Sequence, residues 1–217
     1  MAINADKILL LVLSSDDSHY NLLESKWRTY MHRHPMIRAK FVKCDESSPI
    51  SYESGDIFYV NVKDSIRPGV FWKIIKALEF YRGTYSLVFR TNLSSFIRLD
   101  EFYELSRNLP KTKLYAGVKA IDGVSFVSGA GCFFSPDIVD KLLELRESYD
   151  GEYDDVFIGK ILSGIVNILP LSRYDITSNL YPTKDSLESH YHIRFKIDDN
   201  RSQEIPVFDH LYELFYG

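Results

Sequence analysis

The chain has 217 residues, of which 45% are hydrophobic and 26% are charged, and its formal net charge at pH 7 is −4. This length and composition fit one folded domain with a substantial core and exclude a disordered chain. The negative charge argues against broad nucleic-acid binding. We therefore expect a single domain over residues 1–217 that does not bind nucleic acid.

The first expected element is the continuous apolar run of residues 8–13, which the polar residues 14–17 end. Such a run is typical of a strand buried on both faces. It is far shorter than the roughly 20 residues of a membrane span, and it lacks the small-residue cleavage site of a signal peptide. Cys44 and Cys132 show no metal-site or disulfide spacing. We expect a cytoplasmic protein without a membrane span.

Strand-like and helical segments alternate over the next 150 residues. The expected further strands are 37–42, 56–62, 86–90 and 132–134, and the expected helices are 18–32, 70–82, 135–145 and one that begins near residue 154. This alternation predicts an α/β fold with a mostly parallel central sheet flanked by helices. After Pro170 the pattern is irregular, polar and aromatic, and it predicts little regular structure.

Four loops follow or precede these elements at positions where ligands bind. In such sheets, ligands bind beyond the carboxyl ends of the strands. The loops are residues 14–18, 91–95, 128–131 and the stretch before Val156. We expect them to converge on one edge of the sheet.

Six motifs occur in order between residues 8 and 165. They are Leu13-Ser14-Ser15 with Trp27, Glu53-Ser54-Gly55-Asp56-Ile57, Trp72-Lys73 to Leu78, Arg90-Thr91-Asn92-Leu93-Ser94-Ser95-Phe96-Ile97, Ser128-Gly129-Ala130-Gly131 with Ser135-Pro136-Asp137, and Asp154-Asp155-Val156-Phe157-Ile158-Gly159. Together they resemble the beta-1,3-galactosyltransferase and N-acetylglucosaminyltransferase (fringe-like) family of GT-A glycosyltransferases. The resemblance implies one GT-A, Rossmann-like domain with a nucleotide-binding half over about 1–98 and an acceptor half over about 99–217.

The resemblance also implies an activity and a donor site. The activity is transfer of a sugar from a nucleotide-sugar donor, expected to be UDP-linked, to a hydroxyl of a glycan acceptor, with inversion because no nucleophile candidate stands out. The implied donor-binding residues are Leu13, Ser14, Ser15, Lys73, Arg90, Asn92, Ser94, Gly129 and Gly131. Ser14 and Ser15 either contact the nucleoside base or cap the following helix. The main alternative is an inactive relative that binds a nucleotide sugar or glycan. A more distant alternative is a nucleotidyltransferase.

The metal motif of this family is degenerate here. Asn92 and Ser94 stand where the family carries two carboxylates, and a neutral amide and hydroxyl are poor ligands for Mg²⁺ or Mn²⁺. We expect that no metal is required, or that Mn²⁺ or Mg²⁺ binds weakly. Two alternatives stay open: the segment forms a simple turn, or Asp100 or Glu101 supplies the missing acid.

A cationic stretch near the C-terminus offers another way to hold a diphosphate. In an extended segment, His190, His192, Arg194 and Lys196 share one face. Such a face can clamp phosphate groups, and the resemblance implies this role for His192 and Lys196, with His192 as a possible metal ligand. The alternative is an exposed strand face balanced by nearby acids.

Asp154 and Asp155 are the expected catalytic residues. An Asp before a helix often caps it, and a second carboxylate is then free to take a proton from the acceptor. The resemblance implies Asp155 as this base, with Asp154 as the cap, although the reverse and a purely structural role stay open. Gly129 and Gly131 either let the backbone approach a sugar or form a bulge.

Overall fold

The computed structural model describes the backbone of residues 4–217 and the side chains of residues 7–217. Its centre is an eight-stranded sheet of order β3-β4-β2-β1-β5-β8-β7-β9. In that order the strands are Tyr52–Ser54, Ile57–Val60, Ile37–Cys44, Asn4–Leu13, Tyr85–Asn92, Val124–Phe134, Tyr115–Asp122 and Ile168–Pro170. Strands β3 and β8 run against their neighbours and the others run in one direction, so the expected mostly parallel sheet is confirmed.

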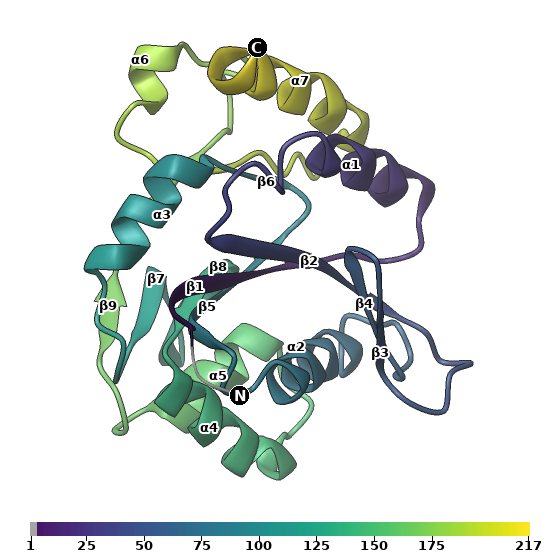
Figure 1. The fold of residues 1–217 in the computed structure, drawn as a ribbon, viewed down its shortest axis with the longest axis vertical. Coiled ribbons are helices and arrows are strands. Elements are labelled where there is room, and N and C mark those ends of the chain that lie inside the picture. Colours follow the sequence, from purple (N-terminus) through teal and green to yellow (C-terminus); the bar gives the residue numbers. More distant parts are fainter. Residues whose placement is uncertain (1–3) are drawn as a thin grey trace.

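Helices cover both faces of this sheet (Figure 1). One face carries α1 (Ser18–Arg28), α3 (Leu99–Asn108) and α7 (Glu204–Tyr216), and the other carries α2 (Gly69–Phe80), α4 (Pro136–Leu145) and α5 (Asp154–Leu162). The alternation of β1 divides the core: Ile8, Leu10 and Val12 pack on the first side, and Leu9, Leu11 and Leu13 on the second. A central strand buried on both faces explains the unbroken apolar run.

A smaller sheet joins the C-terminal segment to the centre of the chain. It consists of β10 (Tyr174–Asp175), β11 (His192–Arg194) and β6 (Ser95–Ile97), in that order. Strand β11 pairs antiparallel with β6, and Arg194 is the register partner of Ser95. The cationic stretch therefore lies beside the loop that follows β5.

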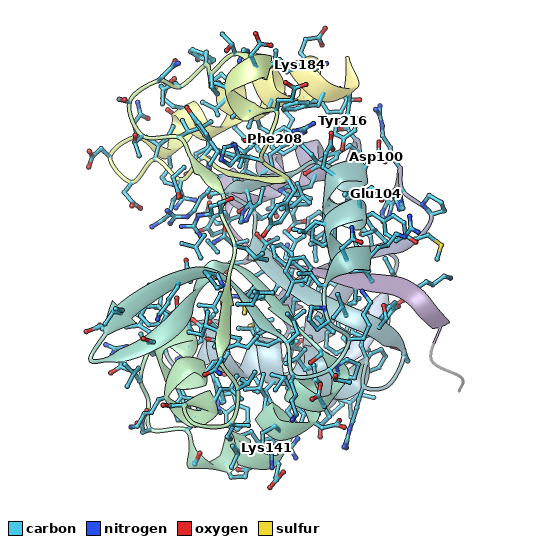
Figure 2. All side chains as sticks on the ribbon, turned by 90° about the vertical axis from the view of Figure 1, so that its left-hand side faces the viewer. Asp100, Glu104, Lys141, Lys184, Phe208 and Tyr216 are labelled. Carbon is cyan, nitrogen blue, oxygen red and sulfur yellow. The ribbon has the colours of Figure 1, made fainter. Side chains whose placement is uncertain are left out.

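Several elements differ from the sequence prediction. The first helix ends at Arg28 rather than near residue 32. Residues 204–216, predicted to be irregular, form α7, whose Phe208 points into the core (Figure 2). The remaining elements are α6 (Lys184–Leu187) and the 3₁₀ turns η1 (Arg146–Ser148) and η2 (Arg201–Gln203). No helix within residues 4–217 has the length and apolar character required to cross a membrane.

Candidate active site

A cleft of about 390 Å³ opens where β1 and β5 end. Leu13 and Asn92, the last residues of these strands, are register partners, so both loops leave the sheet at one edge. Of the predicted site residues, the cleft is lined by Leu13, Ser14, Ser15, Lys73, Arg90, Asn92, Ser94, Gly129, Asp154, Asp155, Arg194 and Lys196. The four loops expected to converge do converge.

Two of the other cavities contrast with this cleft in the residues that line them. One, of about 280 Å³, is lined by residues such as Tyr115, Lys119 and Asn167 and includes no carboxylate. The other, of about 430 Å³, lies near the start of β2 and contains Asp56, whose carboxylate is paired with Arg28. Neither combines a free carboxylate with the carboxyl ends of the parallel strands, where α/β sheets bind ligands.

Lys73 fixes the loop after β1 rather than presenting a free charge. This fully buried side chain donates from Nζ to the Ser14 carbonyl at 2.6 Å and to Ser15 Oγ at 3.2 Å. It also forms an ion pair with Asp64 at 2.8 Å. Because the ammonium group has three donors, these partners satisfy it. Lys73 therefore shapes the cleft but has no donor left for a phosphate.

Arg90 and Asp154 form a buried pair below the cleft. Arg90 Nη2 lies 2.9 Å from Asp154 Oδ2, and both side chains are almost fully enclosed. A Cβ at position 129 would lie 1.8 Å from Arg90 Nη1, so glycine is required there by the close approach of the guanidinium. One role predicted for Gly129 is to let a sugar lie close to its backbone, and in the structure the Arg90 side chain lies there.

The predicted capping role of Asp154 is wrong. The N-cap of α5 is Tyr153, without a side-chain cap hydrogen bond, and Asp154 is the first helical residue. Burial raises the pKa of the Asp154 carboxyl above its ordinary value; Arg90 opposes this shift and Asp155 adds to it. Asp154 is therefore held in a low-dielectric ion pair, and little of its side chain is exposed to the cleft.

Asp155 is the more accessible of the two carboxylates. Its Oδ2 accepts a hydrogen bond from the Gly129 backbone N–H at 2.9 Å, and its Oδ1 accepts one from Val156 N–H at 3.0 Å. Each carboxylate oxygen can accept a second hydrogen bond. The side chain is half-buried and lines the cleft, so it is fixed in direction and can still accept a proton.

Asn92 and Ser94 do not fit a divalent metal ion. Ser94 Oγ donates to Glu204 Oε2 at 2.9 Å and accepts from Arg201 Nη2 at 3.1 Å. Asn92 Oδ1 lies 3.4 Å from Ser95 Oγ and adds no charge. In the described part of the chain, no three His, Cys, Asp or Glu side chains gather as metal ligands. The alternative acids do not help, because Asp100 is exposed on α3 (Figure 2) and Glu101 pairs with Arg98.

Arg194 and Lys196 lie in the cleft, as the period-two pattern predicts. The Arg194 Nε is buried without a hydrogen-bond partner, and its Nη1 is 3.7 Å from Asp175. Lys196 pairs with the exposed Asp198. Arg194 thus keeps an unsatisfied donor beside the cleft, which is what an anionic ligand requires.

His192 and Gly131 depart from the prediction because they do not line the cleft. The His192 ring is buried beside Gly131, where a Cβ would lie 2.5 Å from the ring, and its Nε2 lies 3.0 Å from Ser95 Oγ. Burial lowers the pKa of His192 well below its ordinary value, and Arg173 and Arg194 lower it further. A neutral, enclosed imidazole is neither a phosphate clamp nor an accessible metal ligand, and Gly131 makes room for it.

The structure adds site residues that sequence reasoning missed. Arg201 and Tyr20 line the cleft, and the exposed Tyr153 lies on its rim. Arg173 donates to Ser128 Oγ at 3.1 Å and pairs with Asp175 at 3.0 Å. The helical spacing of the apolar residues in 205–215 is the signal that would have placed Arg201 next to a helix start. No local signal marks Arg173.

No family model matches the sequence, and no curated protein matches it. Solved structures do share the fold. A glycosyltransferase involved in the glycosylation of the major capsid of PBCV-1 has a TM-score of 0.53 at 11% identity, with 94% of this chain and 98% of that chain covered. The apo glycosyltransferase GlyE of Streptococcus pneumoniae TIGR4 has a TM-score of 0.54 at 13% identity, with 93% of this chain and 60% of GlyE covered.

A nucleotidyltransferase is equally similar. The 4-diphosphocytidyl-2C-methyl-D-erythritol synthase of Anaerococcus prevotii DSM 20548 has a TM-score of 0.54 at 13% identity, with 96% of this chain and 99% of that chain covered. At these identities the similarity shows the fold alone. The chain has a glycosyltransferase-like α/β fold that cytidylyltransferases share, and its narrower resemblance to the fringe-like family stays a prediction.

Proposed function

We propose that this protein is a glycosyltransferase whose cleft binds a nucleotide-sugar donor and transfers the sugar to an acceptor hydroxyl. One observation carries the proposal: the half-buried carboxylate of Asp155 and the side chains of Arg194, Lys196 and Arg201 line the same cleft. Sugar transfer from a nucleotide donor needs both features, a base for the incoming hydroxyl and cations for the departing diphosphate. The glycosyltransferase-like fold supports this choice.

In this proposal the two halves of the chain have different tasks. Leu13 at the end of β1, with Ser14 and Ser15 of the loop that follows, contacts the nucleoside, which we expect to be uridine, and Lys73 holds that loop in place. The segment after residue 98 supplies the base and the cationic wall of the cleft, formed by Arg194, Lys196 and Arg201, and receives the acceptor. The cytoplasmic location expected from the sequence remains a prediction.

The proposed reaction is a single displacement. Asp155 takes the proton of the acceptor hydroxyl while the hydroxyl oxygen forms a bond to the anomeric carbon. The bond from that carbon to the diphosphate oxygen breaks, and its electron pair leaves with the nucleoside diphosphate, so the configuration inverts. Gly129 N–H keeps Asp155 in one direction throughout.

A donor-hydrolysis assay tests the proposal. The protein is incubated with UDP-glucose, UDP-galactose and UDP-N-acetylglucosamine, and release of UDP is measured for the wild type and for Asp155→Asn. We expect slow UDP release from one donor and a much smaller rate for the variant. Donor binding without release would favour the inactive nucleotide-sugar-binding relative. If the protein neither binds the donors nor releases UDP from them, the proposal is contradicted.

Nucleotidyl transfer is the second candidate, because the cytidylyltransferase has the same fold over nearly its whole length. That chemistry joins a nucleoside triphosphate to a phosphorylated alcohol and releases pyrophosphate, usually with metal assistance at the phosphates. The neutral residues Asn92 and Ser94 argue against it. Pyrophosphate release from CTP or UTP with a sugar phosphate, in the absence of donor hydrolysis, would favour this candidate.

A further inference from the structure

The loop between β5 and β6, where the fringe-like resemblance implies metal ligands, has an unusual neighbour. Arg201 Nη2 donates to Ser94 Oγ, the side chain at the place of the second expected carboxylate. A guanidinium carries a permanent positive charge. It therefore brings a positively charged group to this loop.

Glu204 holds Arg201 in this position. Its fully buried carboxylate lies 2.6 Å from Arg201 Nε and accepts from Arg201 Nη2 at 3.1 Å. It also accepts from the Ile197 backbone N–H at 3.0 Å and from Ser94 Oγ, and it lies 3.0 Å from His19 Nε2. A carboxylate with this many partners has little capacity left to ligate a metal ion. It is, however, well suited to fix the direction of a guanidinium.

Arg201 reaches the cleft although its partner does not. About 29% of its side chain is exposed, it lines the cleft, and its Cζ lies 5.4 Å from the centroid of the Tyr20 ring. The aromatic ring restricts the guanidinium on one side and the carboxylate on another. A cation that is already ordered loses less entropy when it binds a ligand.

Arg194 and Lys196 extend this charge along the same wall of the cleft. Arg173 and Arg194 both pair with the carboxylate of Asp175. These three side chains together carry one net positive charge. The buried Arg194 Nε has no hydrogen-bond partner. A ligand with several anionic oxygens would satisfy this donor, and a diphosphate is such a ligand.

We propose that Arg201, positioned by Glu204, replaces the metal ion as the main positive charge on the donor diphosphate, with Arg194 and Lys196 beside it. This inference rests on the proposed function, because it assigns the cationic wall to the phosphates of the nucleotide-sugar donor. Arg201 is then a binding residue and Glu204 a positioning residue. Nucleotide binding and transfer should both proceed without a divalent metal.

The test measures UDP, uridine and inorganic pyrophosphate binding by calorimetry, in EDTA and in millimolar Mn²⁺. For the wild type we expect equal UDP affinity in the two conditions. Arg201→Gln should weaken UDP and pyrophosphate binding about tenfold or more, since a charge-assisted hydrogen bond is lost, and should change uridine binding little. Arg201→Lys, which keeps the charge but not the paired donors, should fall between.

Arg146→Gln is the matched control. The Arg146 side chain is also 29% exposed and also pairs with a glutamate, Glu79 at 2.7 Å, but it lies outside the cleft. This variant should leave all three affinities unchanged. Because Arg201→Gln removes the arginine partner of the buried Glu204 carboxylate, the double variant Arg201→Gln with Glu204→Gln removes both charges and should show the same selective loss of UDP.

The outcomes separate the inference from the proposed function. UDP binding that needs Mn²⁺, or that is unchanged in Arg201→Gln, would overturn the replacement of the metal while leaving the donor site intact. Pyrophosphate binding that depends on Arg201, without any binding of UDP, would support the clamp and contradict the nucleotide donor. If the protein binds neither UDP nor pyrophosphate, both the metal replacement and the proposed function are overturned.

Discussion

The cleft has two walls that use buried ion pairs in different ways. In the cationic wall the acid is the hidden partner: the Glu204 side chain is 0% exposed and the Arg201 side chain is 29% exposed. In the acidic wall both partners are hidden, with Arg90 at 8% and Asp154 at 12%, and the accessible charge is the neighbouring Asp155. The first pair presents a fixed cation, whereas the second supports an adjacent carboxylate.

The difference assigns a separate role to each wall. A buried ion pair costs desolvation energy and is weak evidence for stability by itself. A pair that orients a charge towards a ligand has a clearer use. We infer that the Arg201 pair serves phosphate binding and that the Arg90 pair keeps the start of α5 in the geometry that Asp155 needs. The following predictions test this division.

The largest effect should come from Asp155→Asn. Asparagine can still accept the Gly129 N–H bond through its side-chain oxygen, but it cannot take the acceptor proton, so transfer should fall roughly 100-fold or more, or about 2.7 kcal/mol. UDP affinity, measured by calorimetry, should stay nearly constant. Asp150→Asn, an exposed residue of the preceding loop that pairs with Lys160, is the control and should transfer normally. Equal loss of transfer in both variants would contradict the role of Asp155.

Lys73→Met should act on the fold more than on the phosphates. It leaves the Ser14 carbonyl without its buried donor, so we expect a loss of about 1–3 kcal/mol in the free energy of unfolding. Uridine and UDP affinities should fall in parallel, because the loop after β1 is loosened. Lys76→Met, on the same helix but half-exposed and 3.6 Å from Glu79, should cost about 0–1 kcal/mol. Selective loss of UDP affinity would instead indicate that Lys73 contacts the phosphates.

Alanine substitutions at two glycines of β8 distinguish the acidic wall from the core packing around His192. A Cβ at Gly129 would displace Arg90, whereas one at Gly131 would displace the His192 ring. Each alanine substitution should destabilise by about 1–3 kcal/mol, the usual cost of overpacking. Transfer should fall further in Gly129→Ala, since the Asp154 pair and the Asp155 contact lie there. Urea unfolding and transfer assays give both values, and equal transfer in the two variants would contradict the assignment.

The sequence predicted most of the cleft because its parts follow local rules. The apolar runs predicted strands over 8–13 and 86–90, the observed strands end at Leu13 and Asn92, and parallel strands bring their carboxyl ends to one edge. The period of two predicted that Arg194, at the end of β11, and Lys196, just beyond it, share one side. Such patterns predict which side of the chain a residue faces, but not how deeply its side chain is buried. His192 has the same period, yet Gly131 admits its ring into the core.

The missed residues depend on pairings between distant parts of the chain. Arg201 meets Ser94 because β11 pairs with β6 and α7 packs on the sheet, and no local pattern shows either contact. The α7 helix was itself predictable, since Val207, Phe208 and Leu211 recur at helical spacing. The buried role of Glu204 was not, because an acid at the start of a helix is ordinarily explained by the helix dipole.

The smallest effect concerns the pH dependence of stability. Burial raises the pKa of Asp154 in the folded protein, so above its ordinary value near 3.8 the unfolded chain releases this proton first. The stability that Asp154 contributes is then present at low pH and declines as the pH rises through the folded-state pKa. The difference in unfolding free energy between the wild type and Asp154→Asn should therefore decrease with rising pH.

Asp150→Asn gives the opposite control, because Lys160 lowers the pKa of Asp150, and its contribution is lost as the pH falls. Urea unfolding between about pH 3.5 and 7 measures both differences. If the Asp154 difference instead increased with pH, the attraction of Arg90 would outweigh burial, and the Arg90 pair would itself stabilise the fold.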